Sequence, residues 1–287
     1  MTMGMLDGRR IIITGGSQGI GFAVAERCVA EGAKVILCAR NLKELEKATF
    51  RLSAGGSTGH RHFVLDVGVL ADVQAFAAWI EQEKLEINGL VNCAGFYGPI
   101  GKTSEISLAD FTKAIQINFL GTVYMCSLLT RLLKSSGRKK IVNYSGGGAA
   151  TPFPNYSAYA TSKVAIVRFT ENLSLELSAD GVDVNCVAPG FVITRLHQQT
   201  IAAGTQSAGE AFYESTKKQM DAGGVPPEKA AELTSFLLSG ASDGITGKFI
   251  SAPWDPWQTA EFQKQLRDDK DVATLRRIDN KSFFRKS

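Results

Sequence analysis

The sequence has few of the residues and runs that mark secreted, membrane-spanning or metal-binding proteins. Only 5 of its 287 residues are cysteine, and their wide spacing suits neither a disulfide framework nor a metal site. No apolar run approaches the roughly 18 residues that a membrane-spanning helix needs, and the first expected strand begins by about Arg10, too early for a signal peptide. We therefore expect a cytoplasmic protein with reduced thiols, no membrane contact and no bound metal.

An excess of charge of one sign is also missing. The 32 Lys and Arg residues nearly balance the 28 Asp and Glu residues, which leaves a formal net charge of +4 and no basic face for a nucleic acid. No linker, repeat or low-complexity tract divides the chain, and 44% of its residues are hydrophobic. This composition predicts one domain over residues 1–253. A polar extension over residues 254–287 is expected to pack on the body or at a subunit contact.

The chain does contain a regular alternation of strands and helices. Short apolar segments rich in β-branched residues predict strands at residues 10–14, 34–39, 61–67, 89–93, 139–144, 182–188 and 248–251. Helical segments lie between them, including a long one over about 107–134 and one from about Ser157 to Ala179. The alternation predicts an α/β fold: a Rossmann-like, doubly wound parallel sheet of about seven strands with helices on both faces.

The first strand runs directly into a glycine-rich turn and a helix. Gly15, Gly19 and Gly21 have the spacing Gly-x-x-x-Gly-x-Gly, and the helix continues to about Ala30. Glycine lets the backbone approach a pyrophosphate, and the helix N-terminus offers free N–H groups and the positive end of its dipole. The turn therefore predicts dinucleotide binding, with a purely structural turn as the alternative.

The end of the second strand bears on the choice of cofactor. An acidic residue there would bond the ribose 2′-hydroxyl of NAD and repel a 2′-phosphate. Here the strand ends at Ala39, and Arg40 follows it. Because the Arg40 guanidinium can bond a phosphate, we expect NADP(H) rather than NAD(H). The alternative is a solvated arginine that opens a helix.

Tyr159 and Lys163 form a candidate acid–base pair. They are four residues apart, so on a helix they project from the same face. A nearby ammonium favours the phenolate and lowers the pKa of a tyrosine from its reference value of about 10. Such a pair can pass a proton to or from a substrate oxygen. The alternative is a half-buried tyrosine beside a solvated lysine.

Together these motifs resemble those of the short-chain dehydrogenase/reductase family, over about residues 8–251. Residues 14–21 resemble its cofactor motif, and Tyr159-x-x-x-Lys163 resembles its catalytic motif. Residues 92–95 also match, with Cys93 where an Asn is commoner, as do residues 117–121 and 189–194. The resemblance implies hydride transfer between a nicotinamide and the carbonyl or secondary alcohol of a small molecule, in a homodimer or a homotetramer.

The resemblance also implies roles for individual residues. Tyr159 would protonate the alkoxide or deprotonate the alcohol, and Lys163 would lower the pKa of Tyr159 and hold the nicotinamide ribose. Asn118 would interrupt its helix locally and fix a water that links Lys163 to solvent, with a buried Asn that bonds backbone as the alternative. The residues implied in cofactor binding are Gly15, Ser17, Gln18, Gly19, Ile20, Gly21, Arg40, Asp66, Val67, Asn92, Ala94, Gly95, Tyr159, Lys163, Pro189, Gly190, Val192 and Thr194.

One position departs from the family pattern. The serine that would bind the substrate oxygen is expected thirteen residues before Tyr159, where this chain has Gly146, and Ser145 lies one residue earlier. We expect the run Gly146-Gly147-Gly148 to bulge and to bring Ser145 into the site as a catalytic residue. Otherwise Gly146 occupies the position and the site lacks that hydroxyl.

Residues 191–224 are expected to form a mobile lid over the site, because four glycines interrupt them. The polar lid suggests a sugar-like or cyclitol substrate. The residues that could face it are His197, Gln198, Gln199, Phe212, Tyr97, Phe153 and Tyr156. Two other functions stay open: an NADP(H)-binding sensor or scaffold without turnover, and an epimerase or dehydratase that retains its cofactor.

Overall fold

The computed structural model describes residues 4–134 and 137–277, and it contains one sheet with the strand order β3-β2-β1-β4-β5-β6-β7. All neighbouring strands are parallel. The expected doubly wound parallel sheet is therefore confirmed. The strands are β1 (Arg10–Thr14), β2 (Lys34–Ala39), β3 (Arg61–Val64), β4 (Gly89–Asn92), β5 (Lys139–Tyr144), β6 (Val182–Ala188) and β7 (Phe249–Ser251).

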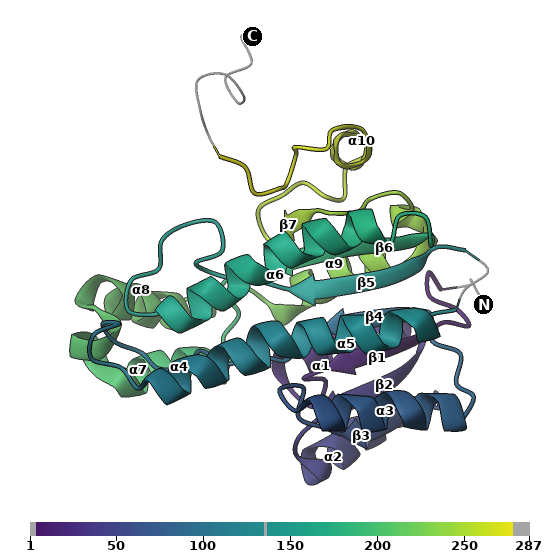
Figure 1. Cartoon of the computed structure of the whole chain (residues 1–287), viewed down its shortest axis with the longest axis horizontal. Coiled ribbons are helices and arrows are strands. Elements are labelled where there is room, and N and C mark those ends of the chain that lie inside the picture. Colours follow the sequence, from purple (N-terminus) through teal and green to yellow (C-terminus); the bar gives the residue numbers. More distant parts are fainter. Residues whose placement is uncertain (1–3, 135–136, 278–287) are drawn as a thin grey trace.

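Helices cover both faces of this sheet. Figure 1 shows α3, α5 and α6 in front of the sheet, α1 and α9 behind it, and α7 with α8 beyond one end of the strands. Within the described part of the chain, no helix is long and apolar enough to cross a membrane. The helices are α1 (Gly19–Ala30), α2 (Leu42–Ser53), α3 (Leu70–Gln82), α4 (Leu108–Ile115), α5 (Gly121–Leu129), α6 (Ser157–Glu176), α7 (Arg195–Ala208), α8 (Glu210–Asp221), α9 (Pro227–Leu238) and α10 (Ala260–Asp268).

The apolar strands are explained by this double cover. Ile11 and Ile13 of β1 belong to the core that the sheet forms with α1, α2 and α9. Ile12, between them, belongs to the core with α3 and α5 on the other face. All three side chains are fully buried. A strand with helices on both sides has no solvent face, so it does not alternate polar and apolar residues.

Several predicted boundaries are wrong by a few residues. The third strand was expected to reach residue 67, but β3 ends at Val64, because the Asp66 N–H leaves the ladder and donates to Asp72 Oδ2 (3.0 Å). The long helix expected over 107–134 is interrupted by a π-helical segment, Gln116–Leu120, between α4 and α5. Local widening of a helix in this way often marks a functional position.

Four apolar residues at helical spacing, Ile166, Phe169, Leu173 and Leu177, form a stripe along α6 and its C-cap. This stripe packs against the core of the chain. Ile166 and Leu173 are buried, and Phe169 and Leu177 are partly buried against the core. A second copy is therefore not needed to cover this stripe. The homodimer or homotetramer implied by the resemblance stays a prediction.

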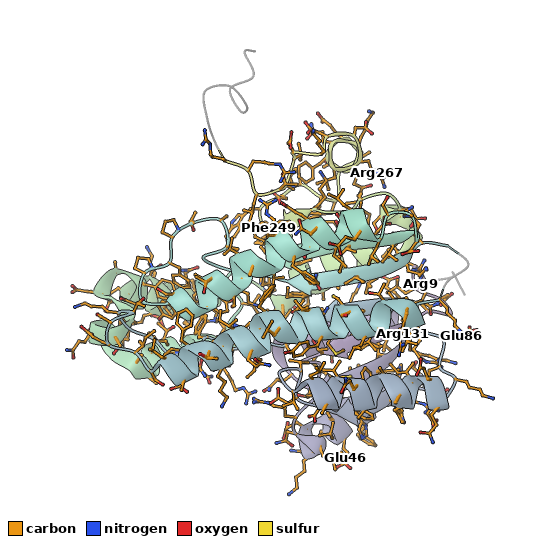
Figure 2. The ribbon with its side chains drawn as sticks, viewed as in Figure 1. Arg9, Glu46, Glu86, Arg131, Phe249 and Arg267 are labelled. Atoms are coloured by element: carbon orange, nitrogen blue, oxygen red, sulfur yellow. The ribbon has the colours of Figure 1, made fainter. Side chains whose placement is uncertain are left out.

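The chain beyond β7 packs back onto the edge of the sheet. The Phe249 N–H of β7 donates to the Ala273 carbonyl (2.7 Å). Arg267 of α10 donates to two carbonyl groups in the turn after α9, at 2.7 and 3.0 Å (Figure 2). Over residues 254–277, then, the extension lies on the body of the protein. Residues 278–287 of the predicted extension lie outside the described residues.

Candidate active site

The turn between β1 and α1 has a backbone that only glycines suit. Gly15 and Gly19 have φ of +66° and +55°, and a Cβ on Gly21 would lie 2.4 Å from the Gly15 carbonyl oxygen. Gln18 caps α1 without a side-chain hydrogen bond, and the first turn contains no acidic residue. The first N–H groups of α1 thus keep their capacity for an anion. This arrangement fits a cofactor pyrophosphate.

The turn opens between β1 and β4, where the strand order reverses. Thr14 Oγ1 ties the two strand ends together, because it accepts hydrogen bonds from the N–H groups of Cys93 (3.0 Å) and Ala94 (3.2 Å). Asn92 donates to Asn143 Oδ1 of β5 (2.9 Å). Burial raises the pKa of the Cys93 thiol to about 12, so it is neutral at pH 7. Dinucleotides bind at such switch points of doubly wound sheets.

Arg40 lies on the rim of this crevice, where β2 ends. Its side chain is 65% exposed, and Nη1 lies 3.8 Å from Asp66 Oδ2. Asp66 also accepts a hydrogen bond from the Gly68 N–H (2.9 Å). A solvent-exposed pair at this distance stabilises little, so Arg40 is free to turn toward a phosphate.

Asn118 lies in the π-helical segment and is fully buried. Its Oδ1 accepts from the Phe96 N–H, and its Nδ2 donates to the Phe96 carbonyl and to Ser162 Oγ, all at 2.9 Å. The predicted local interruption of the helix at Asn118 is confirmed. Its side chain fixes the loop after β4 against α6, as expected for the alternative of a buried Asn that bonds backbone, and its role in fixing a water stays a prediction.

Tyr159 and Lys163 of α6 are both buried, and both line the same cavity. Lys163 Nζ donates to the Tyr144 carbonyl (2.9 Å) and lies 5.5 Å from the centroid of the Tyr159 ring. Burial lowers the pKa of Lys163. Burial, followed by the neighbouring Cys93, raises the pKa of Tyr159 above its ordinary value. The expected lowering by Lys163 is not seen in this structure, and the Tyr159 phenol is protonated at pH 7.

Ser145 lies at the cavity, but its hydroxyl is bonded within the protein rather than to Tyr159. The Ser145 hydroxyl donates to the Lys163 carbonyl (3.0 Å), and the Ser145 N–H keeps its sheet hydrogen bond to Val187. Gly146 faces Tyr159 instead, since a Cβ on Gly146 would lie 2.5 Å from the Tyr159 hydroxyl oxygen. Ser145 nevertheless lines the same cavity, so its predicted catalytic role stays a prediction, while regular pairing with β6 continues through Ser145 and places Gly146 against the Tyr159 hydroxyl.

A cavity of about 460 Å³ lies at the carboxyl ends of these strands. Its lining contains no acidic residue, and Lys163 is the only lysine or arginine in it. Six further residues predicted to bind the cofactor also line it: Ile20, Gly95, Pro189, Gly190, Val192 and Thr194. The lining also contains five large aromatic side chains, those of Tyr97, Phe153, Phe191, Phe212 and Trp254.

The expected lid consists of α7 and α8, with breaks at Gly204 and Gly209, whose φ values are +72° and +84°. Its motion stays a prediction. Of the predicted lid candidates, His197 and Phe212 line the cavity, whereas Gln198 and Gln199 are exposed. Tyr156 does not line it, while the unpredicted lining residues include Thr151, Leu196, Gln219 and Ser251.

His197 should make the free energy of unfolding depend on pH. It is 8% exposed, its ring centroid lies 3.9 Å from that of Phe191 in a tilted arrangement, and burial lowers its pKa to about 4. Below about pH 6.5 the unfolded chain binds a proton that the folded chain does not bind until about pH 4. Stability should therefore fall between these values, by about 3 kcal/mol at most.

Urea unfolding of the protein and of a His197→Phe variant at several pH values between 7 and 4 measures this contribution. Other groups titrate in the same range in both proteins, so the difference between the two curves is the quantity of interest. The variant should lose less stability on acidification. Parallel curves would contradict a neutral, buried His197.

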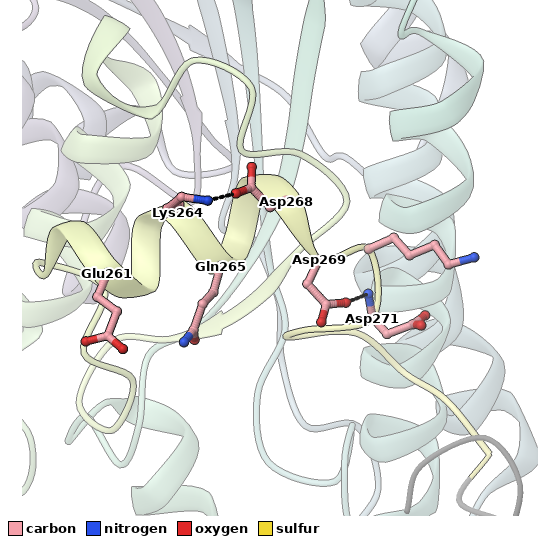
Figure 3. A pocket seen from close by; sticks show the side chains of 7 residues that line it. Glu261, Lys264, Gln265, Asp268, Asp269 and Asp271 are labelled. Atoms are coloured by element: carbon pink, nitrogen blue, oxygen red, sulfur yellow. Dashed lines mark hydrogen bonds and ion pairs between the residues drawn. The ribbon is translucent and has the colours of Figure 1, made fainter. Parts of the chain in front are cut away.

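A second hollow, of about 660 Å³, lies on the extension and shares no lining residue with the cavity at Tyr159. In Figure 3 Lys264 pairs with Asp268, and the Asp269 carboxylate accepts a hydrogen bond from the backbone N–H of Asp271. Among residues 4–134 and 137–277, no group of three or more His, Cys, Asp or Glu side chains is arranged to hold a metal. We therefore assign the chemistry to the cavity at Tyr159.

Two named relatives match most of the length of this chain, and a solved structure shares its fold. D-threitol dehydrogenase of Mycolicibacterium smegmatis is 32% identical over 244 residues, which cover 84% of this chain and 90% of the relative. Levodione reductase of Leifsonia aquatica is 28% identical over 259 residues, covering 88% and 95% of the two chains. A solved structure of NAD⁺-bound xylitol dehydrogenase superimposes with a TM-score of 0.78 at 25% identity, and covers 86% of this chain and 98% of that one.

A model of the short chain dehydrogenase family matches residues 9–204. The matched range contains the glycine turn, Asn118, Tyr159 and Lys163. The sequence match, the sheet order and the shared fold agree. The chain therefore belongs to the short-chain dehydrogenase/reductase family.

Proposed function

We propose that this oxidoreductase uses NADP(H) to interconvert an uncharged ketone and the corresponding secondary alcohol. The observation that carries the proposal is the convergence of Tyr159, Lys163, residues 189–192 and Thr194 on one cavity. Membership in the family supports a nicotinamide cofactor and hydride transfer. The exposed, weakly paired Arg40 supports the phosphorylated form of that cofactor.

In this proposal the turn at residues 15–21 holds the pyrophosphate, Arg40 the 2′-phosphate and Lys163 the ribose. When bound, the nicotinamide supplies or accepts the hydride at the carbonyl carbon. Tyr159 donates its phenolic proton to the substrate oxygen during reduction and takes it back during oxidation. Its raised pKa keeps that proton on the phenol until the oxygen becomes basic.

The cavity wall indicates the class of substrate. Aromatic rings contribute much of the cavity lining, and the lining contains no acidic residue to bond several hydroxyl groups. This wall suits a flat, ring-bearing ketone better than the sugar-like substrate expected from the lid sequence. The names of the relatives point to different substrates, so the wall of this chain's own cavity carries the choice.

A panel of substrates tests the proposed function directly. Cyclic and aromatic ketones, linear polyols and carboxylated ketones would be compared by the change in nicotinamide absorbance with NADPH or NADP⁺. We expect the highest kcat/KM for uncharged cyclic or aromatic ketones. Turnover restricted to polyols or to anionic substrates would contradict the substrate class.

Arg40 should decide the preference between the two cofactors. We expect NADPH to bind at least about tenfold more tightly than NADH, a difference of about 1.4 kcal/mol. Arg40→Ala should remove most of this difference by weakening NADPH alone, because NADH has no 2′-phosphate for the guanidinium. Titration of both cofactors by fluorescence measures it.

Lys43→Ala is the matched control, since Lys43 is also exposed and lies three residues further along, in α2. It removes the same charge without removing a group at the end of β2. Its cofactor preference should stay close to that of the unchanged protein. Equal affinity for both cofactors before any substitution would contradict the assignment of NADP(H).

A further inference from the structure

The hydroxyl group of Tyr97 has no hydrogen-bond partner among the described residues. The residue is 4% exposed and lines the cavity. None of the described residues forms a hydrogen bond with the Tyr97 hydroxyl oxygen. This oxygen is also not closed off from solvent. Buried tyrosine hydroxyls normally find a partner. The Tyr97 hydroxyl is thus available to a molecule in the cavity.

The ring of Tyr97 is held directly against that of Tyr159. The two ring centroids are 4.8 Å apart and the rings are perpendicular, while Tyr156 packs edge-on at 5.2 Å. Phe96, the preceding residue, is bonded through both its N–H and its carbonyl to Asn118. The buried Asn118 therefore fixes the backbone from which Tyr97 projects.

The substrate oxygen lacks the second donor that a serine would supply. Ser145 is committed to the Lys163 carbonyl, and Gly146 has no side chain. A carbonyl oxygen has two lone pairs, and it becomes an alkoxide when the carbon receives a hydride. A fixed donor aimed at that oxygen stabilises the charge as it develops.

We propose that the Tyr97 hydroxyl donates this second hydrogen bond to the oxygen of a ketone substrate, beside Tyr159. The inference rests on the proposed function and adds a catalytic residue to it. During reduction the hydride forms a C–H bond at the carbonyl carbon and the C=O π pair moves to oxygen. The Tyr159 proton then forms the O–H bond, and Tyr97 keeps its own proton.

The surroundings of Tyr97 suit a donor that does not ionise. Burial raises the pKa of Tyr97 above its ordinary value, and nearby Tyr159 and Tyr156 raise it further. The higher pKa keeps the proton on Tyr97, so the hydroxyl can donate throughout the reaction. Tyr97 thus only donates a hydrogen bond. Tyr159 remains the residue that transfers the proton, because it lies next to Lys163 and the proposed ribose site.

Two Tyr→Phe variants within one aromatic cluster test the proposal. Tyr97→Phe should lower kcat with an uncharged ketone such as α-tetralone by about 10- to 100-fold, the value of one hydrogen bond to a charged oxygen. The dissociation constant for NADPH should not change. Tyr156→Phe is the control, since the Tyr156 hydroxyl is bonded to Thr200 Oγ1 (2.9 Å) and does not line the cavity. Its kcat should stay within about twofold.

A second measurement separates this proposal from the proposed function. Calorimetry gives the affinity of α-tetralone for the NADP⁺ complex, in which no turnover occurs. Weaker binding to Tyr97→Phe than to Tyr156→Phe supports the role of Tyr97 even if the unchanged protein turns over no ketone. Equal kcat and equal affinity in the two variants overturn it, although ketone reduction by the unchanged protein would then still support the proposed function.

Discussion

Replacing Tyr159 with Phe is expected to lower ketone turnover by about 10²- to 10⁴-fold. The substitution keeps the ring and its packing but removes the transferable proton, so the alkoxide must be protonated by water. The affinity for NADPH should change little, because Lys163 remains to hold the ribose. Steady-state rates and cofactor titration on one accepted ketone measure both effects.

Lys163→Met provides the comparison for this prediction. It should lower the rate and also weaken NADPH binding, because the ammonium is proposed to contact the ribose. The two variants are thus distinguished by cofactor affinity rather than by rate. Full activity of Tyr159→Phe would overturn the catalytic assignment and favour an NADP(H)-binding sensor or scaffold.

Gly146→Ala should be nearly as damaging, although it adds only one methyl group. The new Cβ would lie 2.5 Å from the Tyr159 hydroxyl oxygen, well inside contact distance, so the hydroxyl must move. Displacing a reacting group by about 1 Å costs about 10²-fold in rate. We expect a loss of that size in kcat, with the melting temperature much less affected.

The neighbouring residues are close controls. A Cβ on Gly147 would meet nothing closer than Phe153, at 3.8 Å, so Gly147→Ala should retain most of the activity. Ser145→Ala should also be nearly silent in rate, because its hydroxyl is used by the α6 backbone. A large rate loss in Ser145→Ala, with little loss in Gly146→Ala, would show that the serine reaches the substrate after all.

The fold was predictable because burial on both faces leaves a strong local pattern. Strands at 34–39, 139–144 and 182–188 begin and end as the sequence predicts. What this pattern does not predict is the burial of a charged residue whose partners lie far away in the sequence. Lys140 is charged yet fully buried, because Asp183 (2.8 Å) and Asp243 (2.7 Å) neutralise it from other elements. The sequence pattern around Lys140 does not predict these partners.

Parts of the site were predictable where a sequence motif fixes the geometry. They were not predictable where a shift of one residue in strand pairing changes which side chain faces the site. Tyr159 and Lys163 share a face of one helix, so their spacing alone brings them together. Ser145 and Gly146 lie on opposite faces at the end of β5, and only the pairing with β6 shows which of them meets Tyr159. Tyr97 lies in a loop whose course depends on Asn118, 21 residues later in the sequence.

The hydrogen bond from Phe249 to Ala273 bears on how this protein meets its neighbours. β7 is an outer strand of the sheet, and a bare outer strand presents unpaired backbone groups that invite a foreign strand to add to it. Here the chain's own C-terminal segment occupies that edge. A protein approaching from this side encounters α10 and the turn after it, with side chains of both charges, so recognition there would depend on side-chain fit rather than on extension of the sheet.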